Sequence, residues 1–564
     1  MTQDRGIGQP VVFQTTIIWS YLTTIFWIHS RMPVLKAPPT LKTSCLDVVC
    51  RLPGDEWGRP HIAVWLPKIT SDTRQPHNLC ANLYQSLLDH LIQTEQLQSW
   101  HLNYVAHDRL TCLRFEKCLD IIDVDSAKLI SMRCPNLEDV SLLGRKQLPV
   151  RSIQLMLGSF AHLRVLDINY TKADDTTMMT LARGCPELQE LRIMKTNVTD
   201  VGLFELCGLG ESGEGCKKVT KLWMYDLTKV TLFGVSYVIR ALKELKELYT
   251  EHNIGFVVYG IYQECLLHNL PLSPLKLDYV SFSSATAKDS PGEKTFTPAP
   301  ASYIKALKLC PNLTNLVINV EMVADIDEEV LLSLFQLKIL ALADSNPELS
   351  NGTFQRDVIP FLSKVGAMLE KVTLIDFSEV DVLAVASHCP VVLSLAFQNV
   401  QGVAEEPVRQ VKDSVFQSIE YFQLDIYVDD VPEESVHYQL ERVLKNAPKL
   451  KRLHLEYVHC FTDDFMTDVM KYNKFESLQT LKLIECHCIT RKTIEALMNT
   501  ANNFSELMAV NCEKLKTTDL EYLRKLAAWR NISFSVVEGY GKNYHDSESD
   551  VDENDNGEEQ WEEM

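Results

Sequence analysis

Apolar residues recur along most of this chain in the pattern L-x-x-L-x-L. Sixteen copies follow one another, most of them 22 to 32 residues apart, with one interval of 41. The last two apolar positions of a copy alternate with a polar one, which predicts a short, half-buried strand. The copies begin at Leu110, Leu137, Leu163, Leu188, Val219, Leu245, Leu272, Leu313, Leu337, Leu369, Val392, Ile419, Leu450, Leu478, Leu507 and, in degenerate form, Trp529.

Each predicted strand is followed by a turn and a short amphipathic segment. In residues 176–184, for example, Met178, Met179 and Leu181 recur at helical spacing. One such unit cannot bury its apolar side alone, whereas stacked units share a continuous core. The period is that of leucine-rich repeats. We therefore expect an α/β leucine-rich-repeat solenoid over residues 105–538, a ribonuclease-inhibitor-like horseshoe with parallel strands on the concave face and helices on the convex face.

Four copies are preceded by a Cys-Pro pair, at Cys134, Cys185, Cys310 and Cys389. Proline cannot continue a helix and disfavours helix in the residue before it, so the pair ends a repeat helix. Cysteine then serves as a small apolar filler at the inward corner. Metal or redox chemistry is the alternative interpretation. Other copies argue against it, because they carry at this corner Phe160, Ala447 or Phe475, which cannot bind a metal.

These repeats resemble the cysteine-containing leucine-rich repeats of the F-box/LRR and antagonist-of-mitotic-exit type. The pattern of that family continues with Ile/Val-Thr-Asp before the helix, and this chain has Val198-Thr199-Asp200 and Phe461-Thr462-Asp463. The resemblance covers about residues 105–535. It implies the fold and says little about function, because one fold carries many functions.

Both ends of the chain and one insertion depart from the repeat. The predicted divisions are a leader (1–37), a helical N-terminal adaptor or cap region (38–104), a Ser/Pro/Thr-rich insertion (281–300) and an acidic tail expected to be disordered (539–564). Residues 11–29 contain no Asp, Glu, Lys or Arg and are long enough to cross a bilayer. Several polar residues make this segment weakly apolar, so a membrane anchor stays an alternative that we do not favour.

The charge of the chain is uneven. The formal net charge is −20, and residues 546–564 contain ten acidic residues and no Lys or Arg. The body of the chain is also acidic, which argues against nucleic acid as a partner because phosphate binding needs a basic surface. The 16 cysteines are spread at repeat-like positions, which favours reduced thiols and a location in the cytoplasm or nucleus.

A short helix is predicted before the repeats. In residues 40–49, TLKTSCLDVV, Thr40 can cap a helix on which Leu41, Cys45 and Val49 share one face. The segment looks like the elongin-binding box of cullin-RING substrate receptors. With Leu66-Pro67 and an apolar helix at 83–92, the region resembles the zygote-defective family of elongin-linked receptors.

That resemblance implies an elongin-type adaptor bound through Thr40, Leu41, Cys45 and Val49, a cullin, and a role as substrate receptor of a ubiquitin ligase. The spacing of the following Pro element departs from the family pattern, which leaves the choice of cullin open. A Skp-type adaptor, bound through an F-box starting at Leu66-Pro67, is the rival interpretation. A third is a plain cap in a scaffold protein without a ligase link, possibly tethered to a membrane through residues 11–29.

Motifs for catalysis are missing from the sequence. We find no nucleophile–base–acid pattern, no H-E-x-x-H and no dinucleotide fingerprint, so we expect no enzyme and no cofactor. The best metal candidate is Cys486-His487-Cys488. These residues lie too close together to form a tetrahedral site alone, and we interpret them as loop residues with buried thiols.

The predicted substrate surface lies on the concave face. Positions 1, 4 and 6 of the motif face the core, so positions 5 and 7 point to the concave side. In three consecutive copies these positions hold residue types that are enriched in interface centres. The candidate residues are Arg192, Met194, Trp223, Tyr225 and Tyr249, with Glu251 beside them. The alternative is that the aromatic rings only stack along the strands and stabilise the sheet.

Overall fold

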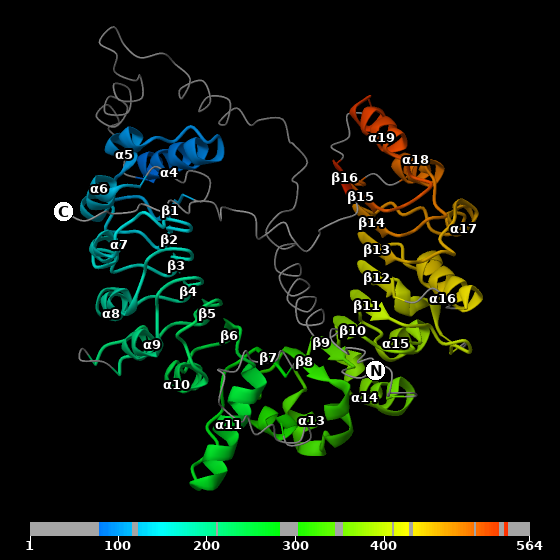
Figure 1. Cartoon of the computed structure of the whole chain (residues 1–564), viewed down its shortest axis with the longest axis horizontal. Coiled ribbons are helices and arrows are strands. Elements are labelled where there is room, and N and C mark those ends of the chain that lie inside the picture. Colours follow the sequence, from blue (N-terminus) through cyan, green and yellow to red (C-terminus); the bar gives the residue numbers. More distant parts are fainter. Residues whose placement is uncertain are drawn as a thin grey trace, which may run out of the picture. The chain divides into compact units, whose positions relative to one another are not determined.

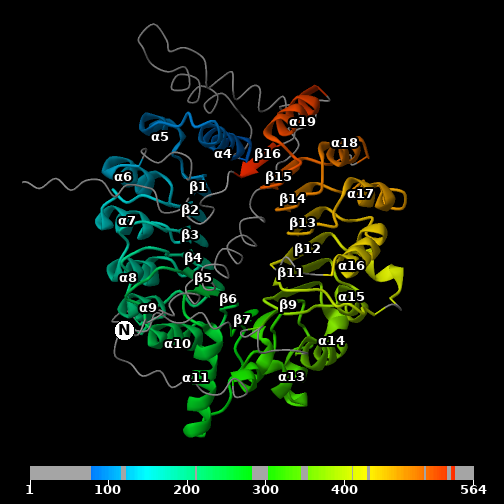
Figure 2. The same ribbon diagram turned by 45° about the vertical axis from the view of Figure 1, so that its right-hand side comes forward.

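The computed structural model of the chain describes residues 78–115, 122–209, 213–282, 303–344, 353–408, 411–427, 432–500, 503–529 and 535–539. The predicted leader, the box helix, almost all of the insertion and nearly all of the acidic tail lie outside these residues. The chain divides into two compact units, residues 1–337 (unit 1) and 338–564 (unit 2). Within each unit, short strands lie side by side and helices cover one side of them (Figure 1; Figure 2).

The described part of unit 1 begins with helices α4 and α5 and continues as alternating strands and helices. Strands β1 to β6 pair in parallel in chain order, and β7 pairs in parallel with β8. The strands are β1 (Cys112–Arg114), β2 (Asp139–Ser141), β3 (Val165–Asp167), β4 (Glu190–Arg192), β5 (Lys221–Met224), β6 (Glu247–Thr250), β7 (Tyr279–Ser281) and β8 (Asn315–Asn319). The helices are α4 (Asn78–Gln93), α5 (Ser99–Val105), α6 (Val124–Arg133), α7 (Val150–Leu157), α8 (Asp175–Gly184), α9 (Asp200–Leu206), α10 (Leu232–Ala241), α11 (Ile254–Leu267), η1 (Lys305–Leu309), η2 (Val320–Asp325) and α13 (Glu328–Ser333).

Unit 2 continues the same alternation, and β9 to β16 pair in parallel in chain order. Its strands are β9 (Ile339–Ala343), β10 (Lys371–Ile375), β11 (Ser394–Val400), β12 (Tyr421–Ile426), β13 (Arg452–Glu456), β14 (Thr480–Ile484), β15 (Glu506–Val510) and β16 (Ser535–Gly539). Its helices are η3 (Phe354–Val358), α14 (Ile359–Val365), η4 (Gly366–Met368), α15 (Val382–His388), η5 (Asp413–Phe416), α16 (Glu433–Asn446), α17 (Asp463–Val469), α18 (Arg491–Thr500) and α19 (Thr517–Trp529). None of the helices in the described parts of the chain is both long and apolar enough to cross a bilayer.

The predicted α/β repeat solenoid is confirmed. Leu188, Leu191 and Ile193 show how one copy builds the core, because the residues at motif positions 1, 4 and 6 are completely buried. The strand between them contributes one short parallel rung. Stacking these rungs joins the apolar residues of neighbouring copies into one core in each unit.

Three copies were placed in the wrong register. The seventh begins at Leu277, which is 1% exposed, and not at Leu272, which is 44% exposed. The fifteenth begins at Phe504, because Leu507 pairs with Leu481 at motif position 4. The last does not begin at Trp529, which ends α19; its strand is β16. In the seventh and fifteenth copies, another apolar residue near the motif made a shifted frame fit equally well. In the last copy the strand register puts Glu538 at position 6, so the apolar residues from Trp529 onward matched the motif better than the strand itself.

The structural interpretation of the Cys-Pro pairs is confirmed. Cys134, Cys185, Cys310 and Cys389 each stand at the C-cap of a repeat helix, and all four are completely buried. Burial raises the pKa of the Cys185, Cys310 and Cys389 thiols to about 12. These thiols therefore stay protonated at physiological pH and act as apolar fillers.

The Thr-Asp pairs link successive repeats. Thr199 caps α9 with its own side chain, and Asp200 accepts hydrogen bonds from the backbone N–H (2.9 Å) and the hydroxyl (2.6 Å) of Thr231 in the next repeat. Asp175 makes the same two bonds to Thr199, at 2.8 Å each. Each aspartate therefore orders the helix start of the repeat that follows it.

Gly234 makes room for this link. A Cβ atom at Gly234 would lie 2.0 Å from Oδ1 of Asp200. We expect Gly234→Ala to lower the free energy of unfolding of unit 1 by about 2 kcal/mol, the scale of overpacking a tight site. In an Asp200→Ala background the same substitution is expected to cost much less, because the colliding carboxylate is gone. A double-mutant cycle on urea unfolding measures this coupling.

Gly260 supplies the matched control. It also lies within a helix of unit 1, α11, but a Cβ atom there would meet nothing within 4 Å. Gly260→Ala is expected to stabilise unit 1 by about 0.5–1 kcal/mol, the helix-propensity gain alone. Equal effects at both glycines would show that the Asp200 contact does not matter.

Candidate protein-recognition surface

A row of large side chains crosses the strands of unit 1. Arg192 on β4 is aligned with Trp223 on β5, and Trp223 with Tyr249 on β6. The Arg192 guanidinium lies 4.7 Å from the centre of the Trp223 ring, which stacks on the Tyr249 ring at 5.1 Å. The Tyr249 ring stacks in turn on Tyr279 of β7, with 6.2 Å between the ring centres. We call these four residues the aromatic row.

Ion pairs and a hydrogen bond to charged side chains surround the aromatic row. The Arg192 guanidinium lies 3.6 Å from the Asp167 carboxylate on β3, and the Tyr249 hydroxyl donates to Glu247 at 2.9 Å. Lys221 lies between Glu190 and Glu247, at 3.9 and 3.0 Å. Because the strands are parallel and in register, these charges form a second row beside the rings.

The tyrosine hydroxyls of this surface stay protonated over the physiological range. Burial raises the pKa of Tyr249, and the neighbouring Glu247 carboxylate raises it further. Burial likewise raises the pKa of Tyr225 and of Tyr279. Protonated phenols can both donate and accept hydrogen bonds, so this face offers polar contacts next to flat apolar rings.

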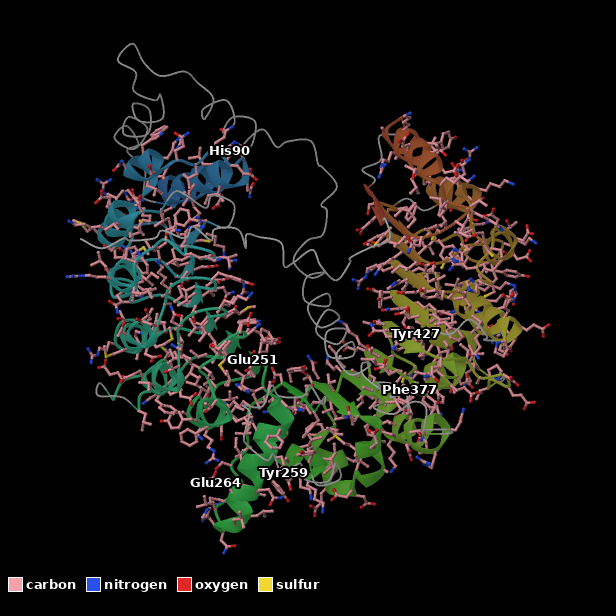
Figure 3. The ribbon with its side chains drawn as sticks, in the orientation of Figure 1. His90, Glu251, Tyr259, Glu264, Phe377 and Tyr427 are labelled. Carbon is pink, nitrogen blue, oxygen red and sulfur yellow. The ribbon has the colours of Figure 1, made fainter. Side chains whose placement is uncertain are left out.

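The structure brings together some of the residues predicted for the substrate surface. Arg192, Trp223 and Tyr249 are in contact, whereas Met194 and Tyr225 follow the ends of their strands and are half-buried. The expectation that Trp223 is exposed is wrong, because its side chain is sandwiched and 9% exposed. The stacking that the alternative expects is present, with 5.1 Å between the ring centres of Trp223 and Tyr249. Glu251, labelled in Figure 3, directly follows β6 and is exposed.

Two members of this surface were missed. Asp167 occupies motif position 5 of the preceding copy, so the same rule could have found it. Tyr279 was missed because it occupies motif position 3 of the copy that starts at Leu277, whereas only positions 5 and 7 were considered. The adaptor residues Thr40, Leu41, Cys45 and Val49 lie outside the described residues, and their role stays a prediction.

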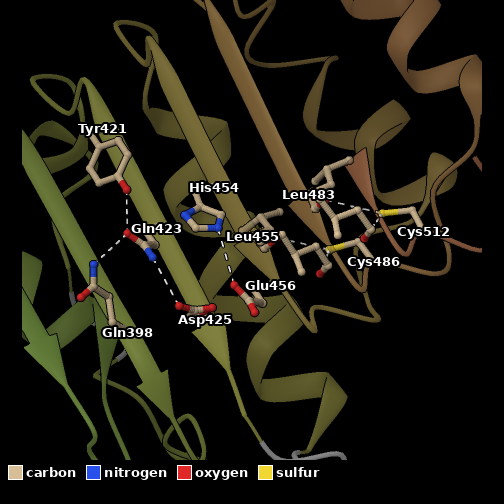
Figure 4. A network of polar contacts seen from close by, with 12 residues as sticks. Gln398, Tyr421, Gln423, Asp425, His454, Leu455, Glu456, Leu483, Cys486 and Cys512 are labelled. Atoms are coloured by element: carbon tan, nitrogen blue, oxygen red, sulfur yellow. Dashed lines mark hydrogen bonds and ion pairs between the residues drawn. The ribbon is translucent and has the colours of Figure 1, made fainter. Parts of the chain in front are cut away.

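Unit 2 carries a different, polar row that sequence reasoning did not single out (Figure 4). Gln423 accepts hydrogen bonds from Tyr421 at 2.6 Å and from Gln398 at 3.1 Å, and donates to Asp425 at 3.3 Å. Asp425 is aligned with Glu456 on the next strand. We call Gln398, Tyr421, Gln423, Asp425, His454 and Glu456 the polar row.

Burial dominates the titration of the polar row. It raises the pKa of Asp425 well above its usual range, with the Glu456 carboxylate as the second cause, and it raises the pKa of Glu456. It also lowers the pKa of His454 well below its usual range, with Lys482 as the second cause. The neutral imidazole Nε2 of His454 lies 3.8 Å from Glu456, beyond hydrogen-bonding distance.

No sequence motif marks the residues of the polar row, because they occupy the variable positions of three copies.

Cys486-His487-Cys488, the candidate metal-binding residues, lie in the loop after β14. Cys486 is completely buried, and its thiol lies 3.4 Å from the carbonyl oxygen of Ile484. His487 stacks on His459 with 5.7 Å between ring centres and lies 3.3 Å from Glu485. Within the parts of the chain that the structure describes, no three His, Cys, Asp or Glu side chains are arranged to hold a metal ion.

Comparisons with known proteins concern the architecture. No protein-family model and no curated protein matches the sequence. A yeast Rad7–Elc1 complex structure is similar over 91% of this chain and 96% of the other, at 14% identity and a TM-score of 0.39. The structure of a TLR13–ssRNA13 complex is similar over 68% of this chain and 54% of the other, at 14% identity and a TM-score of 0.31. The structure of an internalin, InlF of Listeria monocytogenes, is similar over 76% of this chain and 92% of the other, at 12% identity and a TM-score of 0.28. Similarities of this size say nothing about partners or activity.

Proposed function

We propose that unit 1 recognises a protein partner through the strand face around the aromatic row. The observation that supports this is the alignment of Arg192, Trp223 and Tyr249 across adjacent strands, next to the half-buried Met194. Rigid aromatic and arginine side chains at the centre of a surface are the residue types on which interface energy concentrates. The proposed role is binding, without a catalytic step.

A charge placed beside the aromatic row tests this role. We expect Met194→Glu to reduce partner capture by about tenfold or more, because a buried unpaired carboxylate at an interface is costly. Partners would be identified by proximity labelling with the full chain, together with thermal melts. The matched control is Val201→Glu on α9, where the side chain is 57% exposed and belongs to a helix. A stable Met194→Glu variant that keeps the wild-type partners would place recognition elsewhere.

We further propose that the chain is the substrate receptor of a cullin-RING ubiquitin ligase in the cytoplasm or nucleus. This proposal is supported by the sequence resemblance of residues 40–49 to an elongin-binding box. Leu41 would fill a partner pocket with Cys45 beside it, as in helix-in-groove binding. The face around the aromatic row would then hold the substrate.

Substitutions on the apolar face of this predicted helix test the adaptor. The double variant Leu41→Ser, Cys45→Phe is expected to abolish copurification of elongin and to leave the melting of both units unchanged. Leu46→Ser, off the proposed contact face, is the control. Capture of a Skp-type adaptor by the wild-type chain would favour the F-box interpretation. Capture of neither adaptor would leave a scaffold protein without a ligase link.

A further inference from the structure

A pocket of about 540 Å³ lies in unit 2 between α17 and α18. Met466, Met470 and Ala496 line it with apolar groups, and Lys492 and Lys514 line it with amines. Its volume is within the range of real ligand sites. The pocket does not overlap the aromatic row or the polar row, so it is independent of the function proposed above.

The repeat architecture explains where the pocket opens. Thr462, Cys488 and Lys514 come from the loops that follow β13, β14 and β15. Parallel strands bring the loops at their carboxyl ends to one edge of the sheet. Asp463, on the pocket wall, links α17 to α18, because it accepts hydrogen bonds from the hydroxyls of Thr490 (2.6 Å) and Thr493 (2.7 Å). The pocket is therefore bounded by an ordered link between two repeats.

The chain leaves the sheet at this same edge. Gly539, the last residue of β16, is paired with Val510, the last residue of β15. Residues 540–564 follow, and an extended chain spans about 3.3 Å per residue. Strands β16 and β14 are two strand spacings apart, on the order of 10 Å. The remaining segment is therefore several times longer than it needs to be to reach the pocket.

The end of that segment matches the pocket chemically. Residues 558–564, EEQWEEM, place Trp561 between two pairs of glutamates. Lys492 and Lys514 are exposed and have no ion pair within the described part of the chain. Methionine thioethers make favourable contacts with aromatic rings. Two carboxylates on the pocket wall oppose an acidic occupant: Asp463, which already interacts electrostatically with Lys492, and the exposed Asp464. Asp464 supplies a second test.

We propose that residues 558–564 of the same chain occupy this pocket. Trp561 packs on Met470 and Ala496, the half-buried apolar side chains of the wall, and the flanking glutamates pair with Lys492 and Lys514. A tether of this length gives an effective concentration of about 1 mM, so an interaction too weak to detect between separate molecules is populated within one chain. The occupied pocket is closed to other acidic peptides.

Zero-length carbodiimide crosslinking of the full chain, followed by mass spectrometry, tests the proposal. We expect links from the glutamates of 558–564 to Lys492 and Lys514, at a yield that does not depend on protein concentration. Exposed Lys364 on α14 is the control lysine. Trp561→Ala is expected to reduce these links about tenfold, as for loss of one aromatic anchor, whereas Val551→Ala leaves them unchanged.

Two further measurements separate the outcomes. Asp464→Asn is expected to increase the yield, and added salt to reduce it, because the pairing is electrostatic and near the surface. Amide hydrogen exchange in α17 and α18 should be slower in the wild type than in Trp561→Ala. Links that rise with concentration would mean binding to a second copy and would overturn the proposal. Links spread equally over all exposed lysines, or unchanged exchange in Trp561→Ala, would also overturn it.

Discussion

Trp223→Ala is expected to lower the free energy of unfolding of unit 1 by about 3 kcal/mol, at the scale measured for large aromatic side chains removed from packed sites. The ring is sandwiched between the Arg192 guanidinium and the Tyr249 ring, and 9% of the residue stays exposed. Its removal leaves a gap on the strand face and withdraws a stacking partner on each side. Urea unfolding followed by circular dichroism measures the change.

Two comparisons show whether the loss comes from stacking. In a cycle with Tyr249→Ala we expect a coupling energy of about 1 kcal/mol, as for other aromatic pairs. Phe335→Ala, in the turn after α13, is the matched control, because this aromatic residue of unit 1 is 57% exposed, and we expect a change within about 0.5 kcal/mol. Additive effects of Trp223→Ala and Tyr249→Ala would mean that the rings do not support each other.

The stability and the proposed recognition of unit 1 depend on the same residues. The aromatic row is rigid because Trp223 is packed, and rigid side chains lose little conformational entropy on binding. Trp223→Ala therefore cannot separate the two roles by itself. Met194→Glu can, because it changes the chemistry of the surface and leaves the stack in place.

The fold could be predicted because repetition corrects local errors. A single L-x-x-L-x-L match is weak, but sixteen in sequence fix the strand, the core positions and the class of fold. The Cys-Pro pairs also carried their own physical reason, which the helix C-caps confirm. The Thr-Asp pairs entered only through the family resemblance, and the bonds between Asp200 and Thr231 give their structural role. Errors occurred where a second set of apolar residues near the motif offered a shifted frame, as at Leu272 beside the insertion and at Leu507 in the fifteenth copy.

The side chains outside the core were harder to predict. Register alone placed Arg192 next to Trp223, so part of the aromatic row could be found. The burial of Trp223 could not be predicted from register, because its exposure depends on the side chains stacked on its ring. The polar row of unit 2 gave no signal, since Gln, Asp, His and Glu at variable strand positions are typical of exposed sites. The contact of Gly234 with Asp200 was also hidden, because the two residues belong to different repeats.

The polar row should make the stability of unit 2 depend on pH. The folded-state pKa of Asp425 is raised, so the folded protein keeps this proton at pH values where the unfolded chain has lost it. As pH rises from about 4 through the raised pKa of Asp425, stability therefore falls, and above that pKa it falls no further. His454 has the opposite effect. Its folded-state pKa is lowered, so stability falls as pH drops below about 6.5.

Asp425→Asn is expected to stabilise unit 2 at neutral pH. Asparagine can still donate a hydrogen bond toward Glu456 and accept one from Gln423, but it has no proton to lose. Each unit by which the wild-type pKa is raised corresponds to about 1.4 kcal/mol, so the gain should be measurable at pH 7 and vanish near pH 4. Urea midpoints between about pH 4.5 and about pH 8 measure it, with hydrogen exchange of β12 and β13 to confirm that unit 2 is affected. Glu521→Gln, an exposed carboxylate on α19, is the control and should show no such trend. If Asp425→Asn destabilises unit 2 at neutral pH, Asp425 is ionised in the fold and stabilised by Lys482, and the description of Asp425 as a carboxyl group with a raised pKa is wrong.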